Sequence, residues 1–155
     1  MTNKPVTDAL KTALADTYSL QLKTQNYHWN VEGTHFRSLH LLFEEQYNEL
    51  FAAVDVIAER LRTLGEKAPG GYAEFAKLTK VKDGDNSYDD FQMVKDLYQS
   101  NLQLSESFKK AIEKAEKADD PATVDLFTQR IAVHDKAAWM LKSSLEPSLA
   151  KKLAA

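Results

Sequence analysis

Apolar residues recur along most of this chain at intervals of three and four, the spacing that places side chains on one face of an α-helix. No stretch alternates apolar and polar residues in the way that a half-buried β-strand does. Glycine and proline are scarce and fall between the periodic tracts. The pattern therefore predicts four long helices, over about residues 5–31, 36–64, 87–117 and 121–146.

A connection of about twenty residues, 66–86, separates the second and third predicted helices. A structureless loop of that length is unusual in a compact domain, so we expect a short helix around Tyr72–Lys77. Four long helices and one long connection predict an all-α four-helix bundle with a crossover. At 155 residues the chain has the size of one domain, with short tails over about 1–5 and 147–155.

The helix ends carry recognisable signals. Gly65 stands where the second helix needs a C-terminal cap. The stretch Ser87–Asp90 resembles a capping box and predicts the start of the third helix. Asp120 before Pro121 predicts an N-cap followed by proline at the first helical position.

Composition excludes several classes of function. Twenty Lys and Arg stand against 23 Asp and Glu, a net charge of −3, which argues against a polycation that wraps nucleic acid. The chain has no cysteine, so disulfides, thiolate nucleophiles and Cys-ligated metals are excluded. No apolar run approaches about 20 residues, and the N-terminus has no apolar segment typical of a secretion signal. We therefore expect no membrane span.

The second predicted helix carries a row of imidazole and carboxylate groups. Counted from His40 at about 100° per residue, the following acids Glu44, Asp55 and Glu59 all lie within about 100° of it on the helical wheel. The aliphatic stripe of the same helix centres about 70° from His40 in the opposite rotational direction. It therefore faces a different side of the helix from the three acids. Its members are Phe43, Leu50, Val54, Ile57 and Leu61. The polar row thus lies outside the bundle core, unlike the inward Glu-x-x-His pairs of ferritin-type di-iron bundles.

The length of this row decides how it can bind a metal. His40 and Asp55 are fifteen residues apart, or roughly 22 Å along a helix, so two such residues of one chain cannot share an ion. However, His40 and Glu59 lie at equal distances either side of the midpoint between residues 49 and 50, as do Glu44 and Asp55. Two copies of this helix crossing antiparallel at that midpoint would bring His40 to Glu59 of the partner subunit. We therefore expect two identical sites in a symmetric dimer.

A hairpin between the first two helices adds a further ligand. An antiparallel hairpin centred on Thr34 brings His28 beside His40. Nitrogen and oxygen ligands without sulfur suit Fe(II) and tolerate Zn(II), Mn(II) or Co(II). The nearby Glu-x-x-His sequence of residues 32–35 spans a glycine, and we interpret it as accidental.

Ordinary structural roles remain open for the same residues. Asp55 and Glu59 have Arg60 and Arg62 nearby as helical ion-pair partners. His28 is also placed to satisfy carbonyls at a helix end. Trp29 fits a core or interface aromatic. The two histidines without partners at ligand spacing are interpreted as structural or surface residues, His35 and His134.

Together these residues resemble the signature of Dps-type miniferritins, the DNA-binding proteins from starved cells. The resemblance covers the chain in length and helix order, and its specific motif lies within residues 26–65. The matching residues are His28-Trp29-Asn30, Gly33, Phe36, His40 and Asp55-Val-Ile-Ala-Glu59-Arg60. The resemblance implies a ferritin-like fold and a cytoplasmic shell of twelve subunits. Such a shell oxidises Fe(II), preferentially with hydrogen peroxide, and stores Fe(III) mineral.

The resemblance also implies roles for individual residues. The iron ligands would be His28, His40, Asp55 and Glu59, at a dimer interface, with Glu44 as a ligand or a water-mediated partner. Trp29 would be the oxidisable aromatic beside the iron. An acidic iron route at a three-fold axis would use Asp125 first and, with less support, the two acids of the preceding turn, Asp119 and Asp120.

Binding of DNA, after which the family is named, has little support in this chain. The tails offer only Lys4 at one end and Lys151 and Lys152 at the other. We expect weak or absent DNA binding at physiological salt. A nucleoid-associated DNA-binding protein with little ferroxidase activity is the alternative function, and a metal-free helical scaffold is a third.

Overall fold

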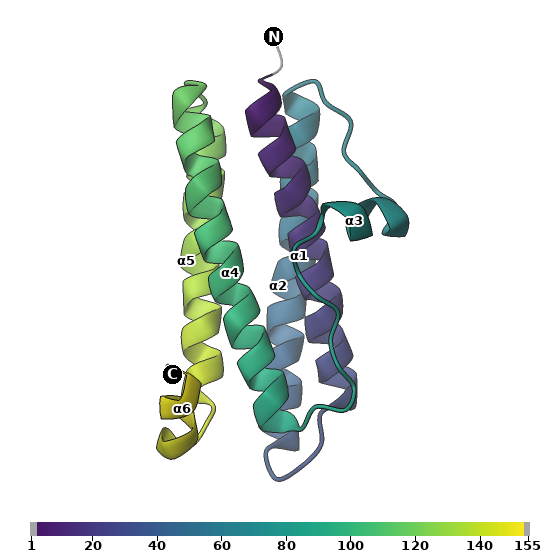
Figure 1. Ribbon diagram of the computed structural model, residues 1–155, viewed down its shortest axis with the longest axis vertical. Helices are drawn as coiled ribbons and strands as arrows, with labels where there is room; N and C mark the ends of the chain where they lie inside the picture. The colour runs from purple at the N-terminus through teal and green to yellow at the C-terminus, as the bar shows by residue number, and fades with distance from the viewer. Residues whose placement is uncertain (1–2, 154–155) are drawn as a thin grey trace.

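Residues 3–153, which the computed structural model describes, form six helices and no β-strand (Figure 1). The helices are α1 (Lys4–Asn30), α2 (Phe36–Thr63), α3 (Tyr72–Leu78), α4 (Asp90–Lys117), α5 (Pro121–Ser143) and α6 (Pro147–Leu153). The all-α, ferritin-like four-helix bundle expected from the sequence is confirmed. None of the helices within this range combines the length and apolar character needed to cross a bilayer.

Two helical hairpins make up the bundle. α1 and α2 form one antiparallel pair, and α4 and α5 form the other, as Figure 1 shows. The crossover from α2 to α4 runs the length of the bundle, so α2 and α4 point the same way. It carries α3, which packs on the outer side of α1. The predicted short helix in this connection is therefore confirmed.

The crossover is fixed to α1 and α4 by buried polar groups. The carboxylate of Asp16 accepts hydrogen bonds from the Thr79 hydroxyl at 2.8 Å and from the Lys80 amide at 2.7 Å. Burial raises the pKa of Asp16, although these hydrogen bonds oppose the shift. Further along, the Tyr27 hydroxyl accepts from the Asp85 amide at 3.0 Å and donates to Asp96 at 2.5 Å. These contacts hold the long connection against the bundle.

Two helix ends match their predicted caps, and one start does not. Gly65, at φ +87°, completes a Schellman motif in which its own amide and that of Glu66 bond to carbonyls of the last turn of α2. The Asp120 side chain accepts from the Thr123 amide at 3.0 Å, as an N-cap should. The predicted start of the third helix at Ser87 is wrong, because the capping box is formed by Asp89 and begins α4 three residues later. Ser87 instead hydrogen-bonds to the side chain of Asp85 in the loop.

Both segments expected as tails contain helical residues. The fifth helix ends at Ser143, and Pro147–Leu153 forms the short helix α6. Leu153 is buried there, which gives the segment an apolar anchor. Helical structure therefore extends into both segments expected as tails, over residues 147–153 at one end and from Lys4 at the other. Residues 1–2 and 154–155 lie outside the described range.

A polar network crosses the core between α2, α4 and α5. The Arg130 guanidinium forms a two-point ion pair with Glu49 and contacts His134 Nε2 at 3.3 Å. Since that nitrogen accepts, Nδ1 of His134 donates to the Asn101 side chain at 2.8 Å. Burial, with a smaller effect of Arg130, lowers the pKa of His134 to about 3. His134 is therefore a structural core residue, in agreement with one of the two roles left open for it.

Candidate metal centre

The turn between α1 and α2 places two histidines side by side. His28 lies in the last turn of α1 and His40 in the second turn of α2, joined by a connection of five residues, 31–35. Their ring centroids are 3.8 Å apart and the planes differ by only 13°. The juxtaposition expected from the hairpin is therefore present.

Each of these histidines is held by the backbone of the other. Nδ1 of His28 lies 2.7 Å from the carbonyl oxygen of His40, and Nδ1 of His40 lies 2.7 Å from the carbonyl oxygen of His28. A carbonyl oxygen can only accept, so each Nδ1 carries a proton and donates it. In a neutral ring this leaves the lone pair of Nε2 free, and a backbone carbonyl is one of the partners that commonly fix a metal-binding histidine. The arrangement rules out the simpler role of His28 as a cap for its own helix, because its partner lies on α2.

Aromatic side chains surround the pair on two sides. The Tyr47 ring meets the His28 ring edge-on at 5.2 Å, and the Phe36 ring stacks on His40 at 5.0 Å. His28 is only 8 % exposed, while His40 is partly accessible. The two rings are thus packed in a defined orientation, and of the two His40 is the more accessible.

The carboxylates of the polar row remain apart from the histidines within one chain. Glu44 is half-buried one turn beyond His40, whereas Asp55 and Glu59 are exposed further along α2. Among residues 3–153, no three His, Asp or Glu side chains come close enough to hold a metal together. A complete ligand set would therefore have to include groups from another subunit.

The alternative ion pairs for Asp55 and Glu59 are not formed. Arg60 pairs with Asp120 at 2.6 Å, and Arg62 donates to the carbonyl oxygen of Glu66 at 3.0 Å. Within residues 3–153, neither Asp55 nor Glu59 takes part in an ion pair. Both carboxylates are consequently available to an external ligand.

Large apolar side chains, which the expected polar row did not include, lie on the same exposed face. Phe51 is 68 % exposed and Val56 is 55 % exposed, although both lie on α2 beside Asp55. The sequence carries a signal for Phe51, which lies eleven residues after His40. That spacing is just over three turns, so Phe51 shares the helix face of the polar row. An exposed apolar group within a charged row indicates a contact surface.

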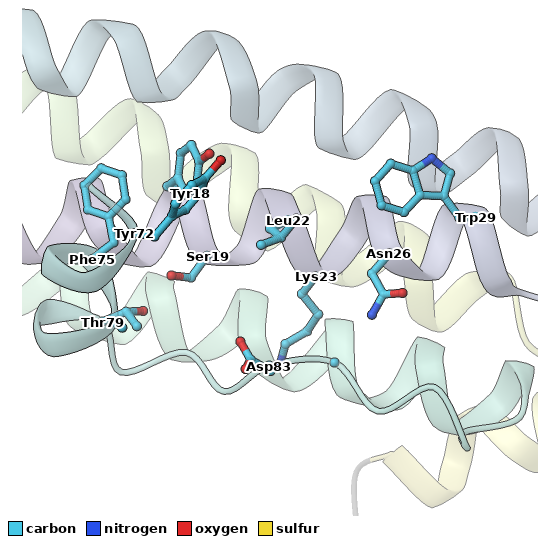
Figure 2. Close-up of a pocket in the computed structure, with 12 residues that line it drawn as sticks. Tyr18, Ser19, Leu22, Lys23, Asn26, Trp29, Tyr72, Phe75, Thr79 and Asp83 are labelled. Carbon is cyan, nitrogen blue, oxygen red and sulfur yellow. The ribbon is translucent and has the colours of Figure 1, made fainter. Parts of the chain in front are cut away.

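Trp29 opens onto a surface cavity. Its indole is 59 % exposed and lines a pocket of about 500 Å³ together with Leu22 of the same helix and Tyr72 of α3. Figure 2 shows Trp29 at one end of this pocket and Tyr72, next to Tyr18, at the other. Trp29 is therefore not a core residue of the single chain, and the interface role remains.

The three acids proposed for an iron route differ in their local structure. Asp119 has φ +51° and completes the Schellman motif that ends α4. Asp120 caps α5; although burial opposes the effect, its contacts with Thr123 and Arg60 hold its pKa below the usual value. Asp125 is exposed and accepts a hydrogen bond from Gln129 at 2.7 Å. A capping role thus accounts for the Asp120 side chain, whereas the carboxylates of Asp119 and Asp125 are exposed. The iron route itself stays a prediction.

Comparison with known proteins identifies the family to which the fold belongs. The model of the ferritin-like domain family matches residues 7–147. The DNA protection during starvation protein of Helicobacter pylori is 34% identical over 139 residues, which cover 89% of this chain and 96% of that protein. The crystal structure of Dps from Staphylococcus aureus is 35% identical with a TM-score of 0.89, covering 94% of this chain and 99% of that chain. Dps from Vibrio cholerae, described as a member of a broad superfamily of ferritin-like diiron-carboxylate proteins, is 28% identical with a TM-score of 0.88, covering 94% and 91%.

The chain belongs to the ferritin-like family. Its similarity over nearly the whole length to proteins and structures named Dps narrows that class further. The protein is a Dps-type miniferritin, as the residues around His28, His40 and Asp55 had indicated.

Proposed function

We propose that this protein is a ferroxidase that oxidises Fe(II), preferentially with hydrogen peroxide, and stores Fe(III) mineral inside a cytoplasmic shell of twelve subunits. The observation that carries the proposal is the stacked pair of His28 and His40, with both Nε2 atoms left free by reciprocal hydrogen bonds. Two preoriented imidazoles without sulfur ligands suit Fe(II).

The remaining ligands are proposed to come from a second copy of the chain. In an antiparallel crossing of two α2 helices, His40 meets Glu59 of the partner subunit and Glu44 meets Asp55 of the partner subunit. Phe51 lies close to the midpoint of that crossing and would be buried there, which favours the pairing by roughly 2 kcal/mol for each copy. This one contact therefore accounts both for the exposed ring of Phe51 and for the carboxylates of Asp55 and Glu59, which form no ion pair within residues 3–153.

The chemistry follows from placing two Fe(II) ions at such a site. Together they supply two electrons to one peroxide, whose O–O bond breaks to give two water molecules after the uptake of two protons. Free hydroxyl radical, the product of one-electron reduction of peroxide, is thereby largely avoided. Trp29, next in sequence to His28 and exposed, is the aromatic placed to be oxidised if a radical escapes.

DNA protection is the second candidate function, because the Helicobacter pylori relative carries that name. The charges of this chain give it limited support. The ammonium group of Lys4 is already 2.5 Å from Asp8, which leaves Lys151 and Lys152 of α6 as the exposed tail cations. We propose weak, salt-sensitive attraction at most. Retardation of duplex DNA at physiological salt that is lost on removing residues 149–155 would favour this second function.

The ferroxidase proposal is tested on the purified oligomer. Light scattering gives its size, and anaerobic loading with Fe(II) followed by titration with peroxide gives the rate and stoichiometry of oxidation. The double variant Asp55→Ala with Glu59→Ala should lose most of this rate while the oligomer stays assembled. A matched control, Glu113→Ala with Glu116→Ala, removes two exposed carboxylates from α4 and should change neither. An unchanged rate in the first variant would contradict the proposed ligand set.

A further inference from the structure

Glu59 and Arg60 are neighbours in sequence but face different sides of α2. Glu59 is exposed on the face proposed to meet the partner subunit. Arg60 instead reaches the turn between α4 and α5, where Nη2 donates to Asp120 Oδ1 at 2.6 Å and Nε donates to the Thr123 hydroxyl at 2.9 Å. The proposed ligand Glu59 is thus directly followed by a residue, Arg60, that is bound to the start of α5.

The contacts of Arg60 are stronger than those of an ordinary surface ion pair. The side chains of Arg60 and Asp120 are only 22% and 13% exposed, so solvent screens their attraction less than on an open surface. The planar guanidinium uses two nitrogens on the start of α5 and a third, at 3.2 Å, on the hydroxyl of Thr63. Thr63 is the last residue of α2. Arg60 therefore links the final turn of α2 to the start of α5.

This link acts on the part of α2 that carries Glu59. The carboxylate of Glu59 has no ion-pair partner among residues 3–153, so its position depends on the backbone of the final turn. Carbonyls at a helix end lack partners within the helix, and the end is prone to fray. Here the Schellman motif at Gly65 and the contacts of Arg60 hold it in place.

We infer that Arg60 is a positioning residue for the metal centre, which fixes the Glu59 carboxylate by fastening the end of α2 to Asp120 and Thr123. The inference rests on the proposed function, because it takes Glu59 as a ligand. It assigns the start of α5 a part in metal affinity, although no residue there belongs to the proposed ligand set.

Asp120 allows the inference to be tested separately from helix capping. Its carboxylate both caps α5 and pairs with Arg60. Asn is as effective an N-cap as Asp, so Asp120→Asn preserves the cap and removes the charge that holds Arg60. If Asp120 acts only as a cap, this substitution should leave the metal centre unaffected.

The measurement is the equilibrium binding of Co(II) to the assembled protein without oxygen, followed through the visible absorption of the bound ion. Equilibrium affinity does not depend on the route by which the ion arrives. Arg60→Gln and Asp120→Asn should each weaken Co(II) binding about tenfold, the usual effect of losing a group that supports a metal ligand. Arg60→Lys keeps the charge without the planar geometry, so its Co(II) affinity should lie between that of Arg60→Gln and that of the unmodified protein. The oligomer size of Asp120→Asn should match that of the unmodified protein, and its unfolding midpoint should fall only slightly, because one ion pair is lost while the cap is kept.

Two further variants separate the possible outcomes. Arg62→Gln removes an exposed arginine from the same turn and should leave Co(II) affinity unchanged. Glu59→Gln should abolish tight binding, and failure to do so would overturn the proposed function itself. If Glu59→Gln loses binding but Arg60→Gln and Asp120→Asn do not, the positioning role of Arg60 is wrong. If Arg60→Gln does not assemble, the result for Asp120→Asn decides alone.

Discussion

His28 and His40 hold each other: each ring donates a 2.7 Å hydrogen bond to the main-chain carbonyl of the other, and the rings stack 3.8 Å apart. The same two residues therefore connect α1 to α2 and also supply the nitrogen ligands of the proposed metal centre. Loss of either ring removes a ligand and also frees the other from one of its restraints.

Replacement of a single member of this pair should therefore be severe. We expect His28→Ala and His40→Ala each to slow peroxide-driven Fe(II) oxidation by more than about tenfold, since a missing ligand and a loosened neighbour act together. The control is His35→Ala, because His35 is an exposed histidine at the start of α2 whose side chain makes no capping hydrogen bond. Stopped-flow absorbance of Fe(III) formation gives the rates. Equal rates in all three variants would remove the histidine pair from the mechanism.

Phe51 tests the proposed two-fold contact. Phe51→Glu places a charge near the centre of an apolar contact and should shift light scattering toward species smaller than the unmodified oligomer. The lost burial alone amounts to roughly 2 kcal/mol for each copy, before the cost of the buried charge is added. Gln99→Glu, at another exposed position on α4, adds the same charge elsewhere and should leave the size unchanged. An oligomer of Phe51→Glu at full size would exclude this face as the interface.

The buried His134 predicts how stability depends on pH. Its pKa is 6.5 in an unfolded chain and about 3 in the folded protein, so below pH 6.5 the unfolded state binds more protons. The resulting stability is complete above pH 6.5 and declines as pH falls toward about 3, by up to about 1.4 kcal/mol per pH unit. Urea unfolding at several pH values between about 7 and about 4 should show this slope. His134→Gln should be less stable at neutral pH and should show a shallower slope, and an identical slope in both proteins would exclude His134 as its source.

Asp119 offers a substitution that should stabilise the fold. Its φ of +51° is costly for a residue with a side chain, and glycine is the usual occupant of this position after a helix. Asp119→Gly should raise the free energy of unfolding by about 1 kcal/mol, seen as a higher melting temperature. The rate of iron uptake in the same variant tests the proposed route. If Asp119 serves only the helix end, uptake stays unchanged.

Asp125 is the better candidate for that route, and its variant should behave differently. Asp125→Asn should slow iron uptake into the assembled oligomer several-fold, because it removes a negative charge that attracts the cation. Equilibrium Co(II) binding at the metal centre should not change, since Asp125 is not one of the proposed ligands. Uptake at the normal rate would place the route elsewhere.

Much of this architecture could be predicted because its signals are local in the sequence. Helical periodicity, Gly65 and Asp120 mark elements by short-range chemistry, and the structure agrees at each. The meeting of His28 and His40 was also predictable, because a five-residue connection between two helices leaves few geometries. The predicted start of α4 is three residues too early. The signal that decides it is also local, since the capping box needs Glu or Gln three residues after the cap, and Gln92 follows Asp89 at that spacing.

The long-range contacts could not be predicted. The sequence suggests that Arg60 pairs with a nearby acid on its own helix, whereas the acid that it meets, Asp120, lies sixty residues away at the start of α5. Which of several arginines and acids meet depends on how the two hairpins are set against each other, and no local pattern encodes that. The same holds for the ion pair between Glu49 and the buried Arg130.

The mutual restraint of the two histidines has a consequence for protein design. Because each imidazole is aimed by a carbonyl of the opposite helix, the pair cannot be transplanted as two side chains. A designer wishing to install it in another scaffold would have to copy the bend of residues 31–35 and the spacing of both helix backbones. The backbone of the two helices and their connection would have to be transferred first, and the two histidines added to it.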